Sequence, residues 1–227
     1  MEPKAMVWWQ CRFDRKTSYT LSWKYQCDIR FYYDSTIVYG NIDCLLAYGC
    51  NVNYQRGNGW PTLHIACKPA NIDIIQRLIK AGADGMIRNE MGNTSSHEVS
   101  YNTRDKKVFH NLFCVSDFNS SNNTGSNPFT LVCLWNPYAK MITCIGDYTC
   151  DIDRLTFCGF TGFYYLCLRD KYDVFEYLLE KCANPFISIV FNDDNGDTGE
   201  QETSYNATSQ GGQVIIDNYL RLRNTST

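Results

Sequence analysis

The chain has 227 residues, of which 44% are apolar and 15% aromatic, and its formal net charge at pH 7 is −3. This composition supports a packed core and excludes wholesale disorder, and the length suits one elongated domain. The small acidic charge, with lysine and arginine scattered along the chain, gives no case for binding nucleic acid or an anionic membrane surface.

The first 25 residues match no later part of the chain. Met6 to Trp9 is apolar, but charged residues follow so soon that we expect no secretory leader. Residues 1–25 are predicted to form an N-terminal cap or extension. The most apolar stretch of the chain, 157–168, is too short to span a bilayer, so we expect no membrane association. The expected location is the cytoplasm, with the nucleus as the alternative.

From residue 59 onward, a short motif recurs with a spacing of 33 to 37 residues. Its clearest copy runs from Gly59 to Cys67 and reads Gly-Trp-Pro-Thr-Leu-His-Ile-Ala-Cys. Later copies begin at Gly92, Gly125, Gly159 and, weakly, Gly196. A motif repeated at such a period indicates supersecondary units that stack in tandem.

A second pattern lies downstream in each unit: an apolar pair, two spacer residues and another apolar pair. Its clearest copy, from Ile74 to Ile79, is followed by Gly82. This spacing marks one face of a helix, and the glycine is expected to end that helix in a left-handed cap. The units are therefore predicted near 26–58, 59–91, 92–124, 125–158, 159–195 and 196–227.

The two patterns together resemble the ankyrin repeat, whose unit is a β-turn followed by two antiparallel helices with a Gly-x-Thr-Pro-Leu-His-x-Ala opening. The second unit carries that opening nearly whole, with Pro61 and Thr62 in swapped order. The resemblance implies an all-α ankyrin-repeat solenoid over 26–227, with about six stacked helix-turn-helix units and β-turn fingers. The degenerate repeats also resemble those of viral and parasite ankyrin proteins.

His64 and His97 fall at the same position of their units. In the ankyrin family this histidine ties neighbouring units together by hydrogen bonds, so the resemblance implies a structural role for both. The unit that begins at Gly125 departs from the pattern and has Thr130 there. No third ligand or acid recurs beside the histidines, so we expect neither a metal site nor a catalytic base.

The chain holds twelve cysteines but no Cys-x-x-Cys pair, which weakens a zinc or redox interpretation. Cys67, Cys133 and Cys167 each lie eight residues after the glycine of their unit. Cys182 lies at or beside the small-residue position that Ala83 occupies in the best unit. Free cysteine packs at such buried positions as a small hydrophobe. Disulfides or metal ligation are the alternatives.

The loops between units differ sharply in sequence, whereas the helix positions repeat. Because stacking constrains only the repeating positions, the varying ones are candidates for contact with a partner. In ankyrin proteins the equivalent fingers and first helices line a concave binding surface. The residues singled out on this ground are Arg56, Trp60, Arg88, Glu90, Asn93, Arg154 and Phe160. The alternative is that these loop residues are merely unconstrained.

The stretch 192–213 is polar and acidic. Its Asp-Asp-Asn-Gly-Asp-Thr-Gly segment lacks the spacing of a calcium loop, so a solvated acidic loop is predicted within a last unit that opens at Gly196. The run from Val214 to Arg223 has helical periodicity and is expected to close the stack.

The implied function is a non-enzymatic scaffold that binds another protein, as a monomer, through the concave finger and first-helix face. No glycine-rich phosphate loop, nucleophile elbow or zinc-protease motif occurs, so we expect no catalytic residue, metal or cofactor. Two alternatives stay open. One is a substrate-recruiting adaptor of a ubiquitin ligase, and the other is a viral or parasite modulator of host signalling.

Overall fold

The computed structural model describes residues 46, 51–55, 59–101, 103–149, 151–192 and 198–225. The predicted N-terminal cap or extension (1–25) and most of the first predicted unit (26–58) lie outside the described residues. Within them, the chain is mostly helical and has one two-stranded sheet near its C-terminal end.

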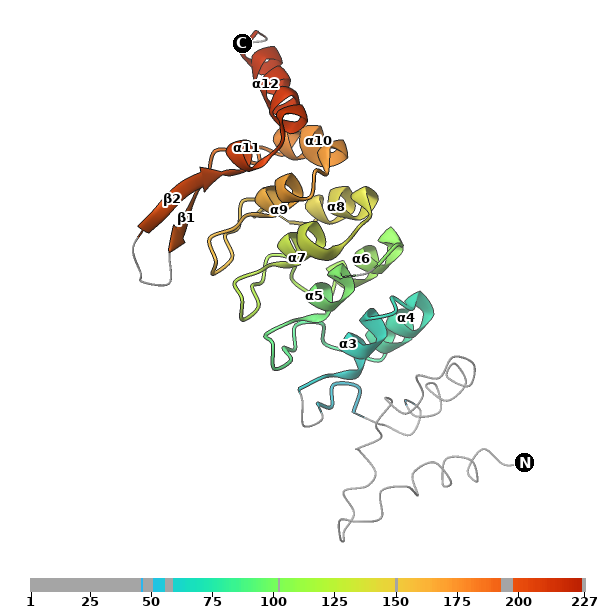
Figure 1. Cartoon of the computed structure of the whole chain (residues 1–227). Helices are drawn as coiled ribbons and strands as arrows, with labels where there is room; N and C mark the ends of the chain where they lie inside the picture. The colour runs from blue at the N-terminus through green and yellow to red at the C-terminus, as the bar shows by residue number, and fades with distance from the viewer. Residues whose placement is uncertain are drawn as a thin grey trace, which may run out of the picture.

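Short helices alternate between two rows (Figure 1). One row holds the first helices, α3 (Thr62–Cys67), α5 (Ser95–Ser100), α7 (Pro128–Trp135) and α9 (Gly162–Leu168). The other holds the second helices, α4 (Ile72–Lys80), α6 (Lys106–Phe113), α8 (Ala139–Gly146) and α10 (Phe175–Glu180), the last preceded by the 3-10 helix η4 (Tyr172–Val174). The chain then forms β1 (Ser188–Asn192), β2 (Thr198–Thr203), α11 (Ser204–Ala207) and α12 (Gln210–Thr225). Each first helix packs on the next, so the helix pairs stack in chain order.

Each first helix begins three residues after the glycine of its motif. In α7 the side chain of Asn127 accepts a hydrogen bond from the N–H of Thr130 at 2.8 Å, and in α9 Thr161 does the same for Tyr164 at 3.1 Å. Thr94 forms a capping box with His97 at the start of α5. These side chains satisfy amide groups that a helix start leaves without partners, which stabilises each start by ~1 kcal/mol.

The second helices bury most of the apolar residues that the sequence pattern identified. In α4, Ile74, Ile75 and Leu78 are buried, and the Asn71 side chain caps the helix start. Gly82 follows α4 with a φ of +86°, so the predicted left-handed cap is confirmed. Burying side chains of this size stabilises the fold by ~1.5–3 kcal/mol each.

The core runs along the stack between the two rows of helices and contains Phe109, Phe129, Phe163 and Phe175 in fully buried positions.

The cysteines in the first helices are packing residues. Cys67, Cys133 and Cys167 are free and buried, which confirms the prediction, and burial raises the pKa of the Cys167 thiol to about 12. Cys182 departs from the expectation, because it is exposed and has a φ of +64°. It occupies the left-handed position after its helix, and the buried small residue is its neighbour Ala183.

The structure differs from two expectations for the C-terminal part of the chain. β1 and β2 pair antiparallel, with Ser188 opposite Thr203, so the described residues 198–203 form a strand where a solvated acidic loop was expected. The next helix, α11, starts after Thr203, whose side chain caps it, and not shortly after Gly196. The segment Ser-Ile-Val-Phe-Asn contains β-branched and aromatic residues, which favour a strand, and this local preference outweighed the weak repeat match.

The final helix, α12, closes the stack as predicted. Ile216 is fully buried, and the Tyr219 hydroxyl donates a hydrogen bond to the carbonyl oxygen of Leu179 at 3.0 Å. Among the described residues, every helix is too short or too polar to cross a bilayer.

Candidate functional site

The loops that precede α5, α7 and α9 end in turns of one construction, here called the fingers. They are residues 89–93, 122–126 and 156–160. In each, the N–H of the first residue donates to the carbonyl oxygen of the fifth, and the N–H of the fourth donates back to the carbonyl oxygen of the first, all at 2.9–3.0 Å. The fourth residue is the repeat glycine, whose φ lies between +73° and +79°, a region where other residues are strained. The sequence period is therefore the spacing of these turns.

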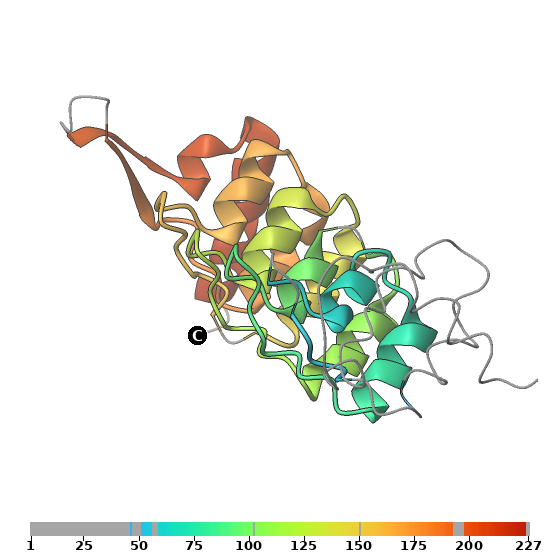
Figure 2. The same cartoon turned by 90° about the horizontal axis from the view of Figure 1, so that it is seen from below.

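Neighbouring fingers are hydrogen-bonded to one another, so they lie side by side along one edge of the stack (Figures 1 and 2). The N–H of Asn123 donates to the carbonyl oxygen of Met91 at 3.0 Å, and its side-chain amide donates to that of Glu90 at 2.9 Å. The N–H of Phe157 donates to the carbonyl oxygen of Thr124 at 2.9 Å. The fingers thus form a continuous ribbon beside the first helices, and we call this combined surface the finger face.

The two repeat histidines fasten the first helices to this ribbon. The Nε2 of His64 donates to the carbonyl oxygen of Asn93 at 2.9 Å, and the Nε2 of His97 donates to that of Ser126 at 3.1 Å. Both rings are fully buried, and burial lowers the pKa of each to about 4. The histidines are therefore neutral at pH 7 and structural, as the resemblance implied.

In the two following units, other residues replace this histidine. Thr130 donates instead to its own helix cap, Asn127, at 2.6 Å. Tyr164 donates through its hydroxyl to Glu202 in β2 at 2.6 Å, which fastens the hairpin to α9. The position keeps a polar link in each case, although the partner differs.

A buried polar network surrounds Glu98 in α5. The carboxylate accepts hydrogen bonds from the side-chain amides of Asn93 at 2.8 Å and Asn89 at 3.0 Å. Only 4% of Glu98 is exposed, and burial raises the pKa of its carboxyl, whereas the two amides and the nearby charge of Lys68 oppose that rise. Every residue of α5 is buried, so this network lies within the packed part of the stack.

The predicted contact residues differ in how much surface they offer. Asn93 is 1% exposed and bonded to Glu98, so it presents no side-chain surface to a partner. Arg88 is exposed, but its Nη1 donates to the carbonyl oxygens of Gly92 at 2.9 Å and of Ser121, which braces two neighbouring fingers. Arg56 lies outside the described residues.

The remaining predicted residues lie on the finger face with part of their surface accessible. Glu90 is exposed. Arg154 pairs with Asp151 at 3.1 Å, and both side chains are about two-fifths exposed (42% and 40%), so this pair contributes ~0.2–1 kcal/mol at most. The ring of Phe160 stacks on that of Tyr164 with centroids 5.0 Å apart. Trp60 is half-buried beside His64.

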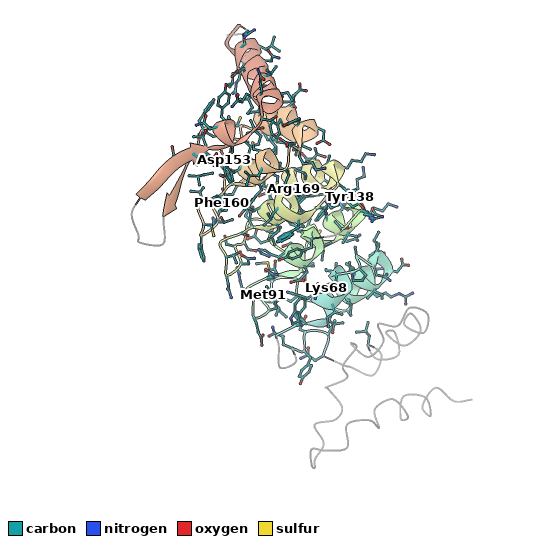
Figure 3. All side chains as sticks on the ribbon, in the orientation of Figure 1. Lys68, Met91, Tyr138, Asp153, Phe160 and Arg169 are labelled. Carbon is teal, nitrogen blue, oxygen red and sulfur yellow. The ribbon has the colours of Figure 1, made fainter. Side chains whose placement is uncertain are left out.

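Sequence reasoning missed the exposed apolar side chains at the finger tips. Phe157 is 80% exposed and Met91 is 59% exposed, and each is within two residues of its repeat glycine. Figure 3 places Met91 and Phe160 on the finger side of the stack and Tyr138 on the side of the second helices. The sequence did carry a signal for these residues, because each is an apolar residue close to a turn glycine. The stacking of the units does not require an apolar side chain at that position.

No group of three or more His, Cys, Asp or Glu side chains that could hold a metal ion occurs among the described residues. An open groove between α10 and α12 is lined by Glu176, Glu180, Asn218, Tyr219, Leu222 and Arg223. The Tyr219 hydroxyl in this groove already donates its hydrogen bond to the carbonyl oxygen of Leu179.

The family model described as "Ankyrin repeat" matches residues 58–90, which hold α3, α4 and the start of the first finger. The protein is thus mostly helical and contains an ankyrin repeat over that range. Protein phosphatase 1 regulatory subunit 27 of Mus musculus is 33% identical over 72 residues, covering 30% of this chain and 47% of that protein. The Homo sapiens protein of the same name is 36% identical over 63 residues, covering 26% of this chain and 41% of that protein.

A longer similarity links the chain to the mitochondrial disaggregase of Homo sapiens. It is 28% identical over 147 residues, covering 62% of this chain and 20% of that protein. The matched regions span less than half the length of each of these relatives. The relatives come from mouse and human, and the expected likeness to viral or parasite proteins gains no support from them. An ankyrin repeat and the likeness to a regulatory subunit indicate a protein-interaction scaffold.

Proposed function

We propose that the protein is a non-enzymatic, monomeric scaffold whose six stacked units hold one partner protein on the finger face. The repeat spacing supports the number of units, including the first, most of which lies outside the described residues. The hydrogen bonds between fingers support a preformed surface, because a ribbon already held in place loses little conformational freedom when a partner binds.

The observation that carries this proposal is the row of exposed apolar side chains at the finger tips. Met91 and Phe157 lie in fingers separated by one other finger, and both are more than half exposed. Leu155, two residues before Phe157, is also exposed. Exposed apolar side chains on the tips of a preformed ribbon favour contact with another protein, because such a contact removes their apolar surface from water.

Around this row, we assign the polar rim to the accessible residues predicted from the sequence. Trp60, Glu90, Arg154 and Phe160 lie on the described finger face, with Arg88 between two fingers. Arg56, four residues before Trp60 in the sequence, is assigned to the rim from its sequence position. Tryptophan and arginine are enriched among residues that dominate interface energetics.

The test is affinity capture of partners from a cell lysate, followed by binding measurements with the purified partner. Met91→Ser and Phe157→Ser are compared with Phe113→Ser, which alters a 52% exposed side chain on the second-helix side. We expect each finger variant to weaken binding about tenfold, as loss of an interface anchor does, and Phe113→Ser to leave binding unchanged. Equal effects of all three changes, with unaltered melting temperatures, would rule out the finger face.

A second candidate is a regulatory subunit of a protein phosphatase. The similarity to protein phosphatase 1 regulatory subunit 27 in two species favours it, although the match covers less than half of that protein. Direct binding to the protein phosphatase 1 catalytic subunit, measured with both proteins purified, would support this candidate. Absence of binding at micromolar concentrations would rule out the phosphatase as the partner, and the general scaffold proposal would still stand.

The remaining expectations stay proposals. We place the protein in the cytoplasm, with the nucleus as the alternative, because buried free thiols such as Cys67 and Cys133 suit a reducing compartment. Cell fractionation tests the location, and sedimentation tests the monomer. A ligase adaptor or a viral or parasite modulator would gain support from co-purification with a cullin-type ligase or with a host signalling protein.

A further inference from the structure

On the finger face, a lysine ammonium lies over a tryptophan ring, and the stacking of the helices does not require this contact. Trp60 precedes α3 and Lys68 follows it, and the Lys68 ammonium lies 4.0 Å from the centroid of the Trp60 ring. The lysine side chain must therefore run back along α3 to reach the indole. Trp60 is half-buried, whereas Lys68 is exposed, so the ring is fixed and the cation above it is free to leave.

The neighbouring unit contributes a buried carboxylate on α5, the helix that packs on α3, and the charge of Lys68 acts on this carboxylate. Glu98 in α5 is 4% exposed and is held by the Asn93 and Asn89 side-chain amides. Within the described residues its carboxylate has no ion-pair partner, and Lys68 acts on it only through space. A buried carboxylate without a paired cation is costly, and a closer cation would stabilise it.

We propose that Trp60 and Glu98 form a receptor for an arginine or lysine side chain of a protein partner, and that Lys68 covers this receptor in the free chain. The inference rests on the proposed scaffold function and specifies the chemistry of its partner. The partner's cation would displace the Lys68 ammonium from the indole face and approach Glu98 from the finger face.

The chemistry of the site favours a basic side chain over other occupants. An aromatic face attracts a cation, and a carboxylate attracts it more strongly still when both are shielded from water. The Trp60 ring already has a cation over it, supplied by the chain itself, so a positive charge fits at this position. A guanidinium can stack on an indole and bond a carboxylate at the same time, which the tethered Lys68 does not do here.

The test uses small probes, so it does not depend on identifying a partner. Nα-acetyl-arginine amide, Nα-acetyl-lysine amide and the neutral Nα-acetyl-citrulline amide are titrated into the full chain. Binding is followed by NMR through the Trp60 indole N–H and the Asn93 side-chain amide. Lys68→Met removes the covering charge and keeps the apolar stem, so we expect it to tighten binding of the two basic probes about tenfold. Citrulline amide should cause no shift in either protein.

Matched variants separate this site from a general charge effect. Lys80→Met makes the same change at an exposed position of α4 and should leave probe affinity unaltered. In the Lys68→Met background, Glu98→Gln keeps an acceptor for the two asparagines and should reverse the gain. Because Glu98 is buried, Trp60→Leu in the same background provides a second variant, followed through the Asn93 amide.

The inference fails if Lys68→Met binds the basic probes no better than Lys80→Met. It also fails if neither Glu98→Gln nor Trp60→Leu weakens binding while the melting temperature shows a folded chain. If a partner binds through the fingers but the basic probes do not bind, the receptor proposal is wrong and the scaffold proposal stands. Probe binding without any captured partner would keep the receptor and count against the scaffold.

Discussion

The Nε2 of His64 lies 2.9 Å from the backbone carbonyl oxygen of Asn93, 29 residues further along the chain. The same link recurs from His97 to Ser126 at 3.1 Å. Each bond joins the first helix of one unit to the finger of the next, so the histidines couple successive turns of the stack. Both rings must be uncharged to remain buried, which makes the coupling sensitive to pH.

Stability is predicted to fall as the pH falls from 6.5 toward 4. The unfolded histidines take up protons near pH 6.5, whereas burial lowers the pKa of folded His64 and His97 to about 4. Between these values the unfolded chain binds more protons, so each histidine removes on the order of 2 kcal/mol of stability as the pH drops. Urea unfolding at pH 7.5 and pH 5 measures the difference.

A histidine variant identifies the source of this pH dependence. Glu98 acts in the opposite direction, because its raised pKa favours the folded state at low pH. The comparison is therefore made between the native chain and His97→Gln. The variant should be less stable at pH 7.5 and should lose about half of the pH-dependent change. An unaltered pH dependence would mean that other groups cause it.

Leu78→Ala is predicted to destabilise the fold by ~2–5 kcal/mol, because the side chain is fully buried between the helices of its unit. The midpoint of urea unfolding should drop. Lys80→Ala, two residues later at an exposed position of the same helix, serves as the control and should change stability by less than about 0.5 kcal/mol. Equal midpoints for the two variants would contradict the core described here.

Gly162→Ala is predicted to destabilise the fold by ~1–3 kcal/mol. A methyl group there would lie 2.7 Å from the Phe129 ring and 3.1 Å from the Cys133 sulfur, where α7 and α9 pack together. Gly211→Ala is the control, because its methyl group would meet only ordinary contacts beyond 3.7 Å in α12. Alanine should raise the melting temperature there, since it restricts the unfolded chain. A melting temperature unchanged by Gly162→Ala would mean that the two helices are further apart.

Much of the helical part could be predicted because local signals and packing agree there. The recurring glycines mark turns that require a positive φ, and the apolar pairs in α4 and α10 mark buried faces. The roles of His64 and Cys67 followed from their positions in the repeat. Each of these residues has a single structural role that recurs with the repeat, so its position in the repeat is enough to predict that role.

The hairpin and the buried network could not be read from the repeat. The repeat signal was weak in this region, whereas the segment 188–192 is rich in strand-forming residues, and it pairs with 198–203. Asn93 looked like a surface loop residue, but its amide is needed inside to bond Glu98. The sequence pattern gives no sign that Glu98 is buried, because the two asparagines that bond its carboxylate lie in a loop and not in the repeating helix positions.

The most direct test of the scaffold face uses thiols that the chain already carries. Cys158 lies in the finger 156–160, whereas Cys114 follows α6 and Cys182 follows α10 on the second-helix side, and all three are free and exposed. Their rates of alkylation by N-ethylmaleimide are measured with and without the captured partner. The scaffold account predicts that the partner slows labelling of Cys158 and leaves Cys114 and Cys182 unchanged. Protection of Cys114 or Cys182, with Cys158 labelled as fast as in the free protein, would contradict it.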